Sequence, residues 1–390
     1  MWFITAIAFL CSIIFYFLLP PRATPALRKK GGFEEKRCRR GEEVHEKGEA
    51  EDVVGAMMAH RCAFQTIASP ALTQREVEFT KSAWIAGLRP DQRGAQQLRE
   101  VNVDFPLLSR DVSCVRCGGT IVTAAIACEL VEPFPYRPKH GIIDFSVRQP
   151  YTERDSSAKT AELKKLTAFL ERLIKGGGVV DTEGLCVLPG RRVWSISVDV
   201  TVLNDEGNVT DVAVWATVAV LLHYRRPELT IRGDSVILHP THERDPVPLS
   251  IHHTPLSFSF AITMAPGDRN KLARGRRDSQ EALEVVVDPT FAEATAASSS
   301  VVVAVNAEGQ VCSVSKSEGS CIHLDEVNHC METASLLAPH ILSLIRDAMA
   351  AHDKRRQEAL KRMFLWAQKR SGVTSEATEP EPAKKLKTET

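Results

Sequence analysis

One stretch, residues 191–227, constrains the fold of this chain more than any other. Within it, every second residue of 194–202 is apolar and polar residues stand between, which predicts a strand with one buried face. A turn at 204–207 follows, where Gly207 is free to adopt a positive φ. Residues 210–223 are apolar on nearly every side, which predicts a helix packed inside a domain. We therefore expect the rest of the chain to wrap around this strand–turn–helix unit.

The same periodicities predict further elements on both sides of this unit. We expect strands at residues 120–130, 141–148, 256–262, 283–288, 301–305 and 310–314, and helices at 72–87, 160–175 and 324–349. Serine and alanine alternate with large apolar residues in 256–262, so this strand is expected to be half-buried. Pro339 lies inside the last predicted helix, where we expect a kink.

Composition narrows the class of protein without naming a function. The 390 residues are 44% hydrophobic and 25% charged, which suits two or three globular domains, or one large domain with tails. Lysine and arginine together number 49, as do aspartate and glutamate, so any nucleic-acid contact must come from local patches. The ten cysteines are scattered, which favours reduced thiols in a nuclear or cytosolic protein.

Three strings carry a family resemblance. Residues 191–213 read R-x-x-W-x-I-x-V-D-x-x-V-L-x-x-D, then Glu206, then G-x-x-x-D-x-A. GVVDTEGLCVLPG precedes them at 178–190, and ERDPVPLSIHH follows at 243–253. Together these strings resemble the RNase PH family, with Glu206 as one extra residue, and within it the non-catalytic subunits of the RNA exosome core. The resemblance extends over about residues 72–352.

The resemblance implies a duplicated α+β fold, with strands followed by helices in two halves. We expect the first RNase PH-type region at 72–255 and the second at 256–352. It also implies partners: other RNase PH-type subunits in a hexameric ring, RNA-binding cap subunits, an associated nuclease and single-stranded RNA. The expected locations are the nucleus, including the nucleolus, and the cytoplasm.

Active relatives hold phosphate with a Gly-Thr-Arg-Ser/Thr string at the start of the buried helix, where N–H groups and a cation can cradle an anion. The corresponding residues here are Asn208, Val209, Thr210 and Asp211. The arginine is missing and a carboxylate stands in the same turn, so the resemblance implies a degenerate phosphate site. Asp211 also has a purely structural explanation, because an acidic residue in the first turn of a helix suits the helix dipole.

Active relatives also use a pair of aspartates near the cleaved bond. Asp245 is a candidate for the first, and His252-His253-Thr254-Pro255 stands where the second would fall. We therefore expect no catalytic residues and a structural, RNA-guiding subunit. The alternative, an active phosphate-dependent 3′–5′ exoribonuclease, would release nucleoside diphosphates from RNA.

Arg89, Arg93 and Arg99 are the candidate RNA-binding residues, since contacts to the RNA backbone need no sequence readout. Arg89 to Arg93 resembles the family string R-x-D-G-R, with Gln92 in place of the glycine. The alternative role for these arginines is in ordinary surface salt bridges.

No cofactor or metal is expected. Cys114 and Cys117 form a lone C-x-x-C without a second pair at zinc spacing, so a structural role is favoured. His252 and His253, with His242 nearby, are adjacent on an expected strand and would point to opposite faces. Packing or hydrogen bonding explains them better than metal binding.

Both ends of the chain lie outside the resemblance. Residues 2–19 carry no charge and are long enough for a signal anchor, so a membrane-tethered adaptor is a third alternative. Met57 and Met58 stand just before the matching region, so 1–56 is read as an extension, disordered after its hydrophobic segment. A basic insertion at 266–281 is either a solvated loop or a contact with RNA or a subunit. A basic amphipathic stretch at 354–370 is either a docking helix or an extension of the last helix. Residues 382–387 resemble a nuclear-localisation string.

Overall fold

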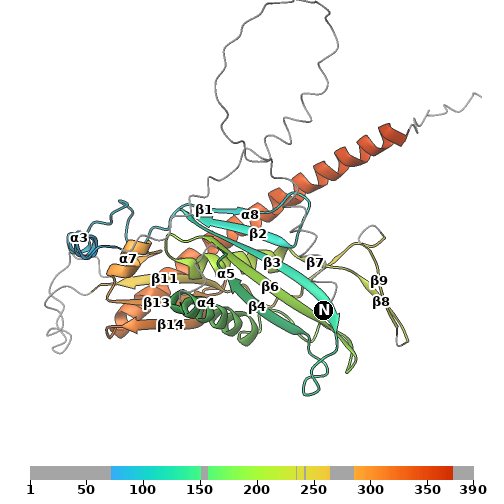
Figure 1. Ribbon diagram of the computed structural model, residues 1–390, viewed down its shortest axis with the longest axis horizontal. Coiled ribbons are helices and arrows are strands. Elements are labelled where there is room, and N and C mark those ends of the chain that lie inside the picture. Colours follow the sequence, from blue (N-terminus) through green and yellow to red (C-terminus); the bar gives the residue numbers. More distant parts are fainter. Residues whose placement is uncertain (1–71, 151–156, 234, 241–242, 264–284, 372–390) are drawn as a thin grey trace, which may run out of the picture. The chain divides into compact units, whose positions relative to one another are not determined.

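The computed structural model describes residues 72–150, 157–233, 235–240, 243–263 and 285–371 (Figure 1). The expectations for residues 1–56, for His242, for the basic insertion at 266–281 and for the string at 382–387 lie outside these residues. Within the described residues, no helix combines the length and the apolar character needed to cross a membrane.

The first sheet is built around the strand predicted at residues 194–202. Its order is β1 (Val101–Asp104), β2 (Val112–Cys117), β3 (Thr120–Val131), β6 (Arg192–Asn204), β4 (Ile142–Arg148), with the short β5 (Cys186–Leu188) also paired to β6. Neighbours are antiparallel except β4 and β6, which are parallel. The predicted alternation is confirmed, because the apolar residues of β6 from Trp194 to Val202 are at most 2% exposed.

The second sheet has the order β12 (Val285–Val287), β11 (Leu256–Ile262), β13 (Ser299–Val305), β14 (Val311–Gly319). The predicted hairpin is confirmed by the antiparallel pairing of β13 and β14. The expectation that 256–262 is half-buried is wrong, because every residue of β11 is buried. Its serine-bearing face is also covered: Ser257 and Ser259 contact helix α5, and Ala261 packs with Trp84.

Helix α5 (Val209–His223) packs against β2, β3 and β6 of the first sheet and against β11 of the second (Figure 1). A helix covered on both sides by sheets has no wet face, which explains why its sequence is apolar almost all round. The helix ends at His223, just before Arg225 and Arg226, which form the two-residue strand β7 paired with β10 (Val247–Pro248). The predicted helix is therefore confirmed.

Among the described residues, four more helices pack around these sheets. They are α3 (Gln74–Ile85), α4 (Ser157–Leu170) with a π-helical turn (Glu171–Gly176), α7 (Phe291–Ala296) and α8 (Leu324–Ser371). The predicted end of the last helix at residue 349 is wrong, because α8 continues without a break through Pro339 and as far as Ser371. The extension of the last helix through 354–370 is confirmed, and docking of this stretch with a partner stays a prediction.

A separate hairpin, β8 (Leu229–Arg232) with β9 (Ser235–Leu238), follows α5 and is not among the predicted strands. In the described residues it pairs with neither large sheet. Its Ile231, Ile237 and Leu238 are among the exposed large hydrophobic residues.

Candidate functional site

The residues that correspond to the family's phosphate site lie where α5 begins, after the turn that follows β6. Asn208, the residue before the helix, is left-handed, with φ of 57° and ψ of 40°. Asn208, Val209 and Thr210 are half-buried, and Asp211 is fully buried. The structure thus gathers the four predicted residues in one turn, but the side chains of Asn208 and Asp211 bind different partners.

Asp211 faces the second sheet. Its carboxylate accepts hydrogen bonds from the Ser257 hydroxyl (2.9 Å) and from both the backbone N–H (2.6 Å) and the hydroxyl (3.0 Å) of Ser259. Burial raises the pKa of this carboxyl to about 6, although the hydrogen bonds from Ser257, Asn208 and Ser259 act in the opposite direction. Asp211 therefore joins the start of α5 to β11.

Asn208 points instead to Asp288, a fully buried residue after β12 that itself has a left-handed φ of 51°. The Asn208 amide donates to Asp288 Oδ1 at 2.7 Å. Arg93 Nη1 donates to Asp288 Oδ2 at 3.0 Å, and Arg99 donates to the same carboxylate from Nε (2.9 Å) and Nη2 (2.8 Å). Burial alone would raise the pKa of Asp288, but hydrogen bonds and charge from Arg99 outweigh it and lower the pKa to about 2.

Arg89 lies entirely inside the protein. Its guanidinium forms a bidentate ion pair with Glu293, through Nε (2.8 Å) and Nη2 (2.7 Å), and both side chains are 0% exposed. It also donates to the carbonyls of Gly94, Val287 and Asp288. Glu293 in turn completes a capping box with Thr290 at the start of α7. The three candidate arginines therefore converge on the segment 287–293, where Arg89 serves as an internal tie.

Arg93 and Arg99 remain slightly accessible, at 11% and 10% of their side chains, and line a cavity of about 700 Å³. Leu72, Leu98 and Phe291 supply apolar walls. Four acidic residues also line the cavity: Asp91, Glu100, Asp205 and Glu206. Both arginines are already paired with Asp288, so the carboxylates dominate the electrostatics of this opening.

Glu206, the extra residue before Gly207, has a specific place in this cavity. Its carboxylate lies so close to Gly119 that a Cβ at Gly119 would collide with it. The Glu206 backbone N–H donates to the Thr120 hydroxyl (3.2 Å), which in turn donates to the Gly207 carbonyl (2.7 Å). The insertion is thus built into the turn and brings a negative charge toward the start of α5.

The candidate catalytic carboxylate and its histidine neighbours are not joined to this region. Asp245 is exposed in the segment before β10, and His252 is exposed beyond the isolated bridge between Val180 and Ile251. None of the hydrogen bonds among the described residues connects Asp245 or His252 with the start of α5. The backbone N–H of His252 donates to the Val179 carbonyl at 2.9 Å.

One group of side chains has the composition of a metal site: His223, His352 and Asp353. His223 Nε2 and His352 Nδ1 are 2.8 Å apart, and His352 Nε2 lies 2.7 Å from the Pro106 carbonyl oxygen. Asp353 is paired with Arg110 at 2.8 Å. Burial, followed by the charge of His352, lowers the pKa of His223 to about 4. These contacts form a hydrogen-bonded pair of histidines that ties α5 to α8.

The C-x-x-C pair lies on β2, and the cysteines of the described residues are free thiols. Cys117 is buried with its Sγ 3.6 Å from Asp288 Oδ2, and burial raises the pKa of this thiol. It belongs to the surroundings of Asp288.

Sequence reasoning missed Asp288 and Glu293, the two acidic partners of the arginines. A local signal was available, because Thr290-x-x-Glu293 matches the capping-box pattern. It also missed the aromatic pair Phe134 and Tyr136, whose rings stack with centroids 5.4 Å apart and an interplanar angle of 16°. Their signal is the proline-rich string PFPYRP at 133–138.

Comparisons with known proteins give a consistent result. Residues 97–227 match the model of the 3′ exoribonuclease family, domain 1, and residues 275–335 match domain 2. The chain is 34% identical over 293 residues to "Exosome complex component RRP45A" of Arabidopsis thaliana, an alignment covering 73% of this chain and 89% of that protein. It is 32% identical over 299 residues to "Exosome complex component RRP45" of Homo sapiens, covering 75% of this chain but only 64% of the human protein.

Solved structures support the fold. The structure described as "archaeoglobus fulgidus exosome with RNA bound to the active site" superposes with a TM-score of 0.56 at 19% identity, covering 69% of this chain and 97% of the other. An "Archaeal exosome core" chain gives 0.55 at 18% identity, with coverages of 70% and 96%. At this level of identity the likeness concerns the fold, which is the α+β architecture expected. The matches to both domains of the family model and the 34% identity to RRP45A show that the chain belongs to the RNase PH family of 3′ exoribonucleases, as an RRP45-like member.

Proposed function

We propose that this chain is a non-catalytic structural and RNA-guiding subunit of an RNA exosome ring. It would act in 3′–5′ RNA processing and degradation, including ribosomal RNA maturation and mRNA turnover. The observation that carries the proposal is the 34% identity over 293 residues with RRP45A, a protein named as an exosome component. Its partners would be other RNase PH-type subunits, RNA-binding cap subunits, an associated nuclease and single-stranded RNA.

The start of α5 supports the absence of catalysis. Asn208 donates its amide to Asp288, Asp211 is committed to β11, and no arginine occupies positions 208–211. An incoming phosphate would meet carboxylates near the turn, such as that of Glu206. A like charge at about 4 Å costs about 1 kcal/mol in water and about 4 kcal/mol at an effective dielectric constant near 20. The degenerate phosphate site and the missing carboxylate pair are part of this proposal.

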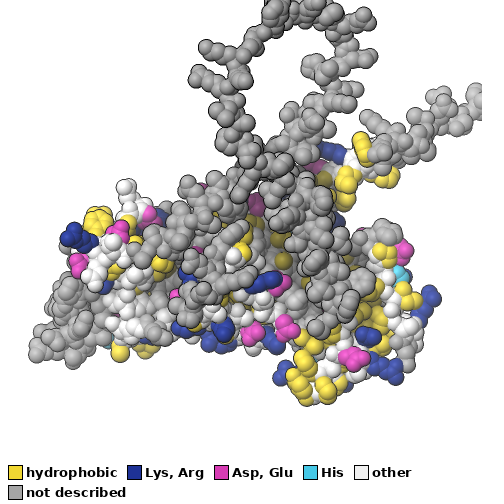
Figure 2. Space-filling view, in the orientation of Figure 1, with side chains coloured by type: hydrophobic (Ala, Val, Ile, Leu, Met, Phe, Trp, Pro, Cys, Tyr) yellow, Lys and Arg dark blue, Asp and Glu magenta, His cyan; other side chains and the backbone are white. Residues whose placement is uncertain are grey.

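RNA guidance needs exposed cations and surfaces on which bases stack. Phe134 and Tyr136 are 47% and 73% exposed, and the same loop carries Arg137 and Lys139. The loop is fixed, since the Arg137 N–H donates to the Phe134 carbonyl and Gly190 donates to the Pro138 carbonyl. The lower right of Figure 2, over the strand ends of the first sheet, displays hydrophobic side chains beside lysines and arginines. We assign RNA contacts to this loop. Of the three candidate arginines, Arg93 and Arg99 are paired with Asp288 at an opening rich in carboxylates, and Arg89 is buried in its pair with Glu293, so they are not the exposed cations that RNA guidance needs.

The test separates ring subunit from enzyme. The full chain, purified alone and in its native complex, is incubated with single-stranded RNA in phosphate buffer, and nucleoside diphosphates are measured. We expect no release by the chain alone, and co-purification of the endogenous protein with other RNase PH-type proteins. Release that is abolished by Asp245→Asn would establish the alternative, a phosphate-dependent exoribonuclease. Recovery of the native protein as a lone monomer would overturn ring membership.

For localisation we propose the nucleus, including the nucleolus, and the cytoplasm. The membrane-tethered alternative rests on residues 2–19 alone. Identifying the N-terminal peptide of the native protein by mass spectrometry decides between them. A start at Met57 or Met58 removes the hydrophobic segment, whereas a peptide containing it in a membrane fraction would favour the tether.

A further inference from the structure

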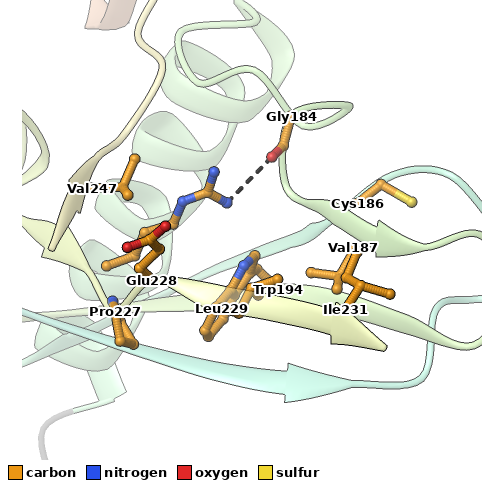
Figure 3. Close-up of a pocket in the computed structure, with 10 residues that line it drawn as sticks. Gly184, Cys186, Val187, Trp194, Pro227, Glu228, Leu229, Ile231 and Val247 are labelled. Atoms are coloured by element: carbon orange, nitrogen blue, oxygen red, sulfur yellow. Dashed lines mark hydrogen bonds between the residues drawn. The ribbon is translucent and has the colours of Figure 1, made fainter. Parts of the chain in front are cut away.

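A small pocket of about 200 Å³ lies between β5, β6 and the hairpin β8–β9, away from the start of α5 (Figure 3). Cys186 and Val187 of β5, Trp194 of β6, and Leu229 and Ile231 of β8 are among the residues that line it. A volume of this size suits one side chain of a partner better than a complete small-molecule ligand, because ligand pockets commonly measure about 300–1,000 Å³.

Trp194, which lines this pocket, carries an unsatisfied hydrogen-bond donor. Trp194 is 2% exposed, and its indole Nε1 is buried with no hydrogen-bond partner in the described part of the chain. A buried N–H without an acceptor is costly, and in most proteins a buried indole N–H finds one. An occupant that brings a carbonyl or carboxylate oxygen into the pocket would satisfy this donor.

A cation lies beside the donor. Arg226 lines the pocket and donates from Nη1 to the Gly184 carbonyl at 3.2 Å, the bond marked by the dashed line in Figure 3. Glu228, the acidic residue of the lining, is already paired with Arg244 at 3.2 Å. The charge left for an occupant is therefore positive, which favours an anionic group next to the apolar one.

The hairpin supplies an open edge. Within the described residues β8 pairs only with β9, and its backbone register places Arg232 opposite Ser235 and Thr230 opposite Ile237. The opposite edge of β8 is thus available for a further strand, as in β-strand addition. Ile231 is 46% exposed at this edge, and Ile237 and Leu238 of β9 are 39% and 49% exposed. An exposed strand edge with apolar side chains is a typical protein-docking surface.

We propose that this pocket receives an extended segment of another protein, with a large apolar side chain inserted between Leu229 and Val187 and an adjacent acidic side chain on Arg226. A carbonyl oxygen of the segment accepts from Trp194 Nε1, and its backbone pairs with the open edge of β8. The assignment goes beyond RNA guidance, because it concerns a protein partner and a pocket whose lining shares no residue with the degenerate phosphate site at 208–211.

The test uses defined probes on the full chain. The tryptophan indoles are labelled with ¹⁵N, and the chain is titrated with acetyl-Ser-Glu-Leu-Glu-Ser-amide. Two control peptides replace leucine by serine, or both glutamates by lysine. We expect a saturable shift of the Trp194 indole resonance with the acidic leucine peptide, and at least about tenfold weaker binding of both controls. Trp84 provides an internal control, because its Nε1 is also buried and unpartnered but lies outside this pocket.

Variants keep the result interpretable. Trp194→Phe identifies the resonance by its disappearance. Arg226→Met removes the cation and is expected to weaken binding about tenfold. Ile231→Ser at the exposed rim is expected to abolish binding without touching the core. Alkylation of Cys186, followed by mass spectrometry, should slow when the acidic leucine peptide is bound, while that of the exposed Cys312 is unchanged. The proposal is overturned if the Trp194 resonance does not shift, or shifts equally with all three peptides. Neither RNA nor a ring enters the measurement, so such a failure leaves the proposed function intact.

Discussion

Arg89 and Glu293, 204 residues apart in the sequence, form a bidentate ion pair with both side chains fully buried. Glu293 also caps α7, and Arg89 donates to carbonyls beside β12. One guanidinium therefore holds the segment after α3 against the second sheet. Because both charges are out of water, the loss of either partner would leave the other buried and uncompensated.

Replacing Arg89 by alanine should be strongly destabilising. The Glu293 carboxylate would be left buried without its partner, which typically costs about 3–5 kcal/mol. Urea denaturation followed by circular dichroism measures the change. The matched control is Arg110→Ala, whose pair with Asp353 is partly exposed and should contribute less than about 1 kcal/mol. Equal losses in the two variants would contradict the assignment of Arg89 as an internal tie.

Gln92→Gly should stabilise the chain. Gln92 has a φ of 61°, in the left-handed region where a side chain costs about 1–2 kcal/mol. Glycine removes this strain but gives the unfolded chain more freedom, so we expect a net gain of up to about 1 kcal/mol in unfolding free energy. Gln96→Gly is the control. Gln96 is not among the residues with a positive φ, so glycine at this position should lower the unfolding free energy. A loss in both variants would show that Gln92 is not strained.

Asp211→Asn should change how stability depends on pH. The folded pKa is about 6 against an ordinary value of 3.8, so the folded state binds the proton more tightly. The stabilisation linked to Asp211 is fully present below pH 3.8 and is lost as pH rises through 6, by on the order of 3 kcal/mol. Unfolding free energies at intervals from pH 4 to 7 should lose this downward trend in the variant. An unchanged profile would count against the burial of an ionisable carboxyl at this position.

His223→Gln tests a trend of opposite sign. Burial lowers the folded pKa of His223 to about 4 from 6.5, so the unfolded state binds the proton more tightly. The corresponding stability is present above pH 6.5 and is lost as pH falls toward 4. Glutamine retains a donor for His352 but does not titrate, so the variant should lose less stability between pH 6.5 and 4. Comparison with Asp211→Asn separates the two opposing contributions, and parallel profiles for both variants would refute them.

Phe134→Ala and Tyr136→Ala should weaken RNA binding by the native complex. Loss of one stacked base costs about 1–3 kcal/mol, which corresponds to roughly 5- to 150-fold in Kd. Fluorescence anisotropy with a labelled single-stranded RNA measures the change. Leu336→Ala, at another residue with a highly exposed apolar side chain, is the control and should leave Kd unchanged. Binding that is insensitive to both aromatic substitutions would remove this loop from the RNA surface.

The strand–helix unit around Trp194 could be predicted because its pattern is local: alternation in β6 and uniform apolarity in α5 each describe their own surroundings. The burial of Ser257 and Ser259 could not, since their partner Asp211 is 46 and 48 residues away. The predicted end of α8 at residue 349 is wrong because most residues in the last part of the helix are exposed. In the sequence, a mostly polar stretch of this kind resembles a separate element. The region limits at 72–255 and 256–352 stay a prediction.

The candidate site also has a part that the sequence predicts and a part that it does not. The position of residues 208–211 at the start of a helix could be predicted, because aligning them with the family motif fixes their place along the chain. Their orientation was not predictable, since it depends on Asp288 and Ser259, both distant in sequence. The arginines were chosen for their charge, and charge alone does not distinguish Arg89, which is buried in an ion pair, from Arg93 and Arg99 at a cavity wall.

The Asp288 and Glu293 contacts also set an order of events during synthesis on the ribosome. Arg99 and Arg89 leave the exit tunnel 189 and 204 residues before these acidic partners. At about 5–20 residues per second, translation leaves the arginines without their counter-charges for about 10–40 s. During that interval the nascent segment around α3 is open to chaperones and proteases. A message truncated before codon 288 would yield a polypeptide whose amino-terminal segment never docks.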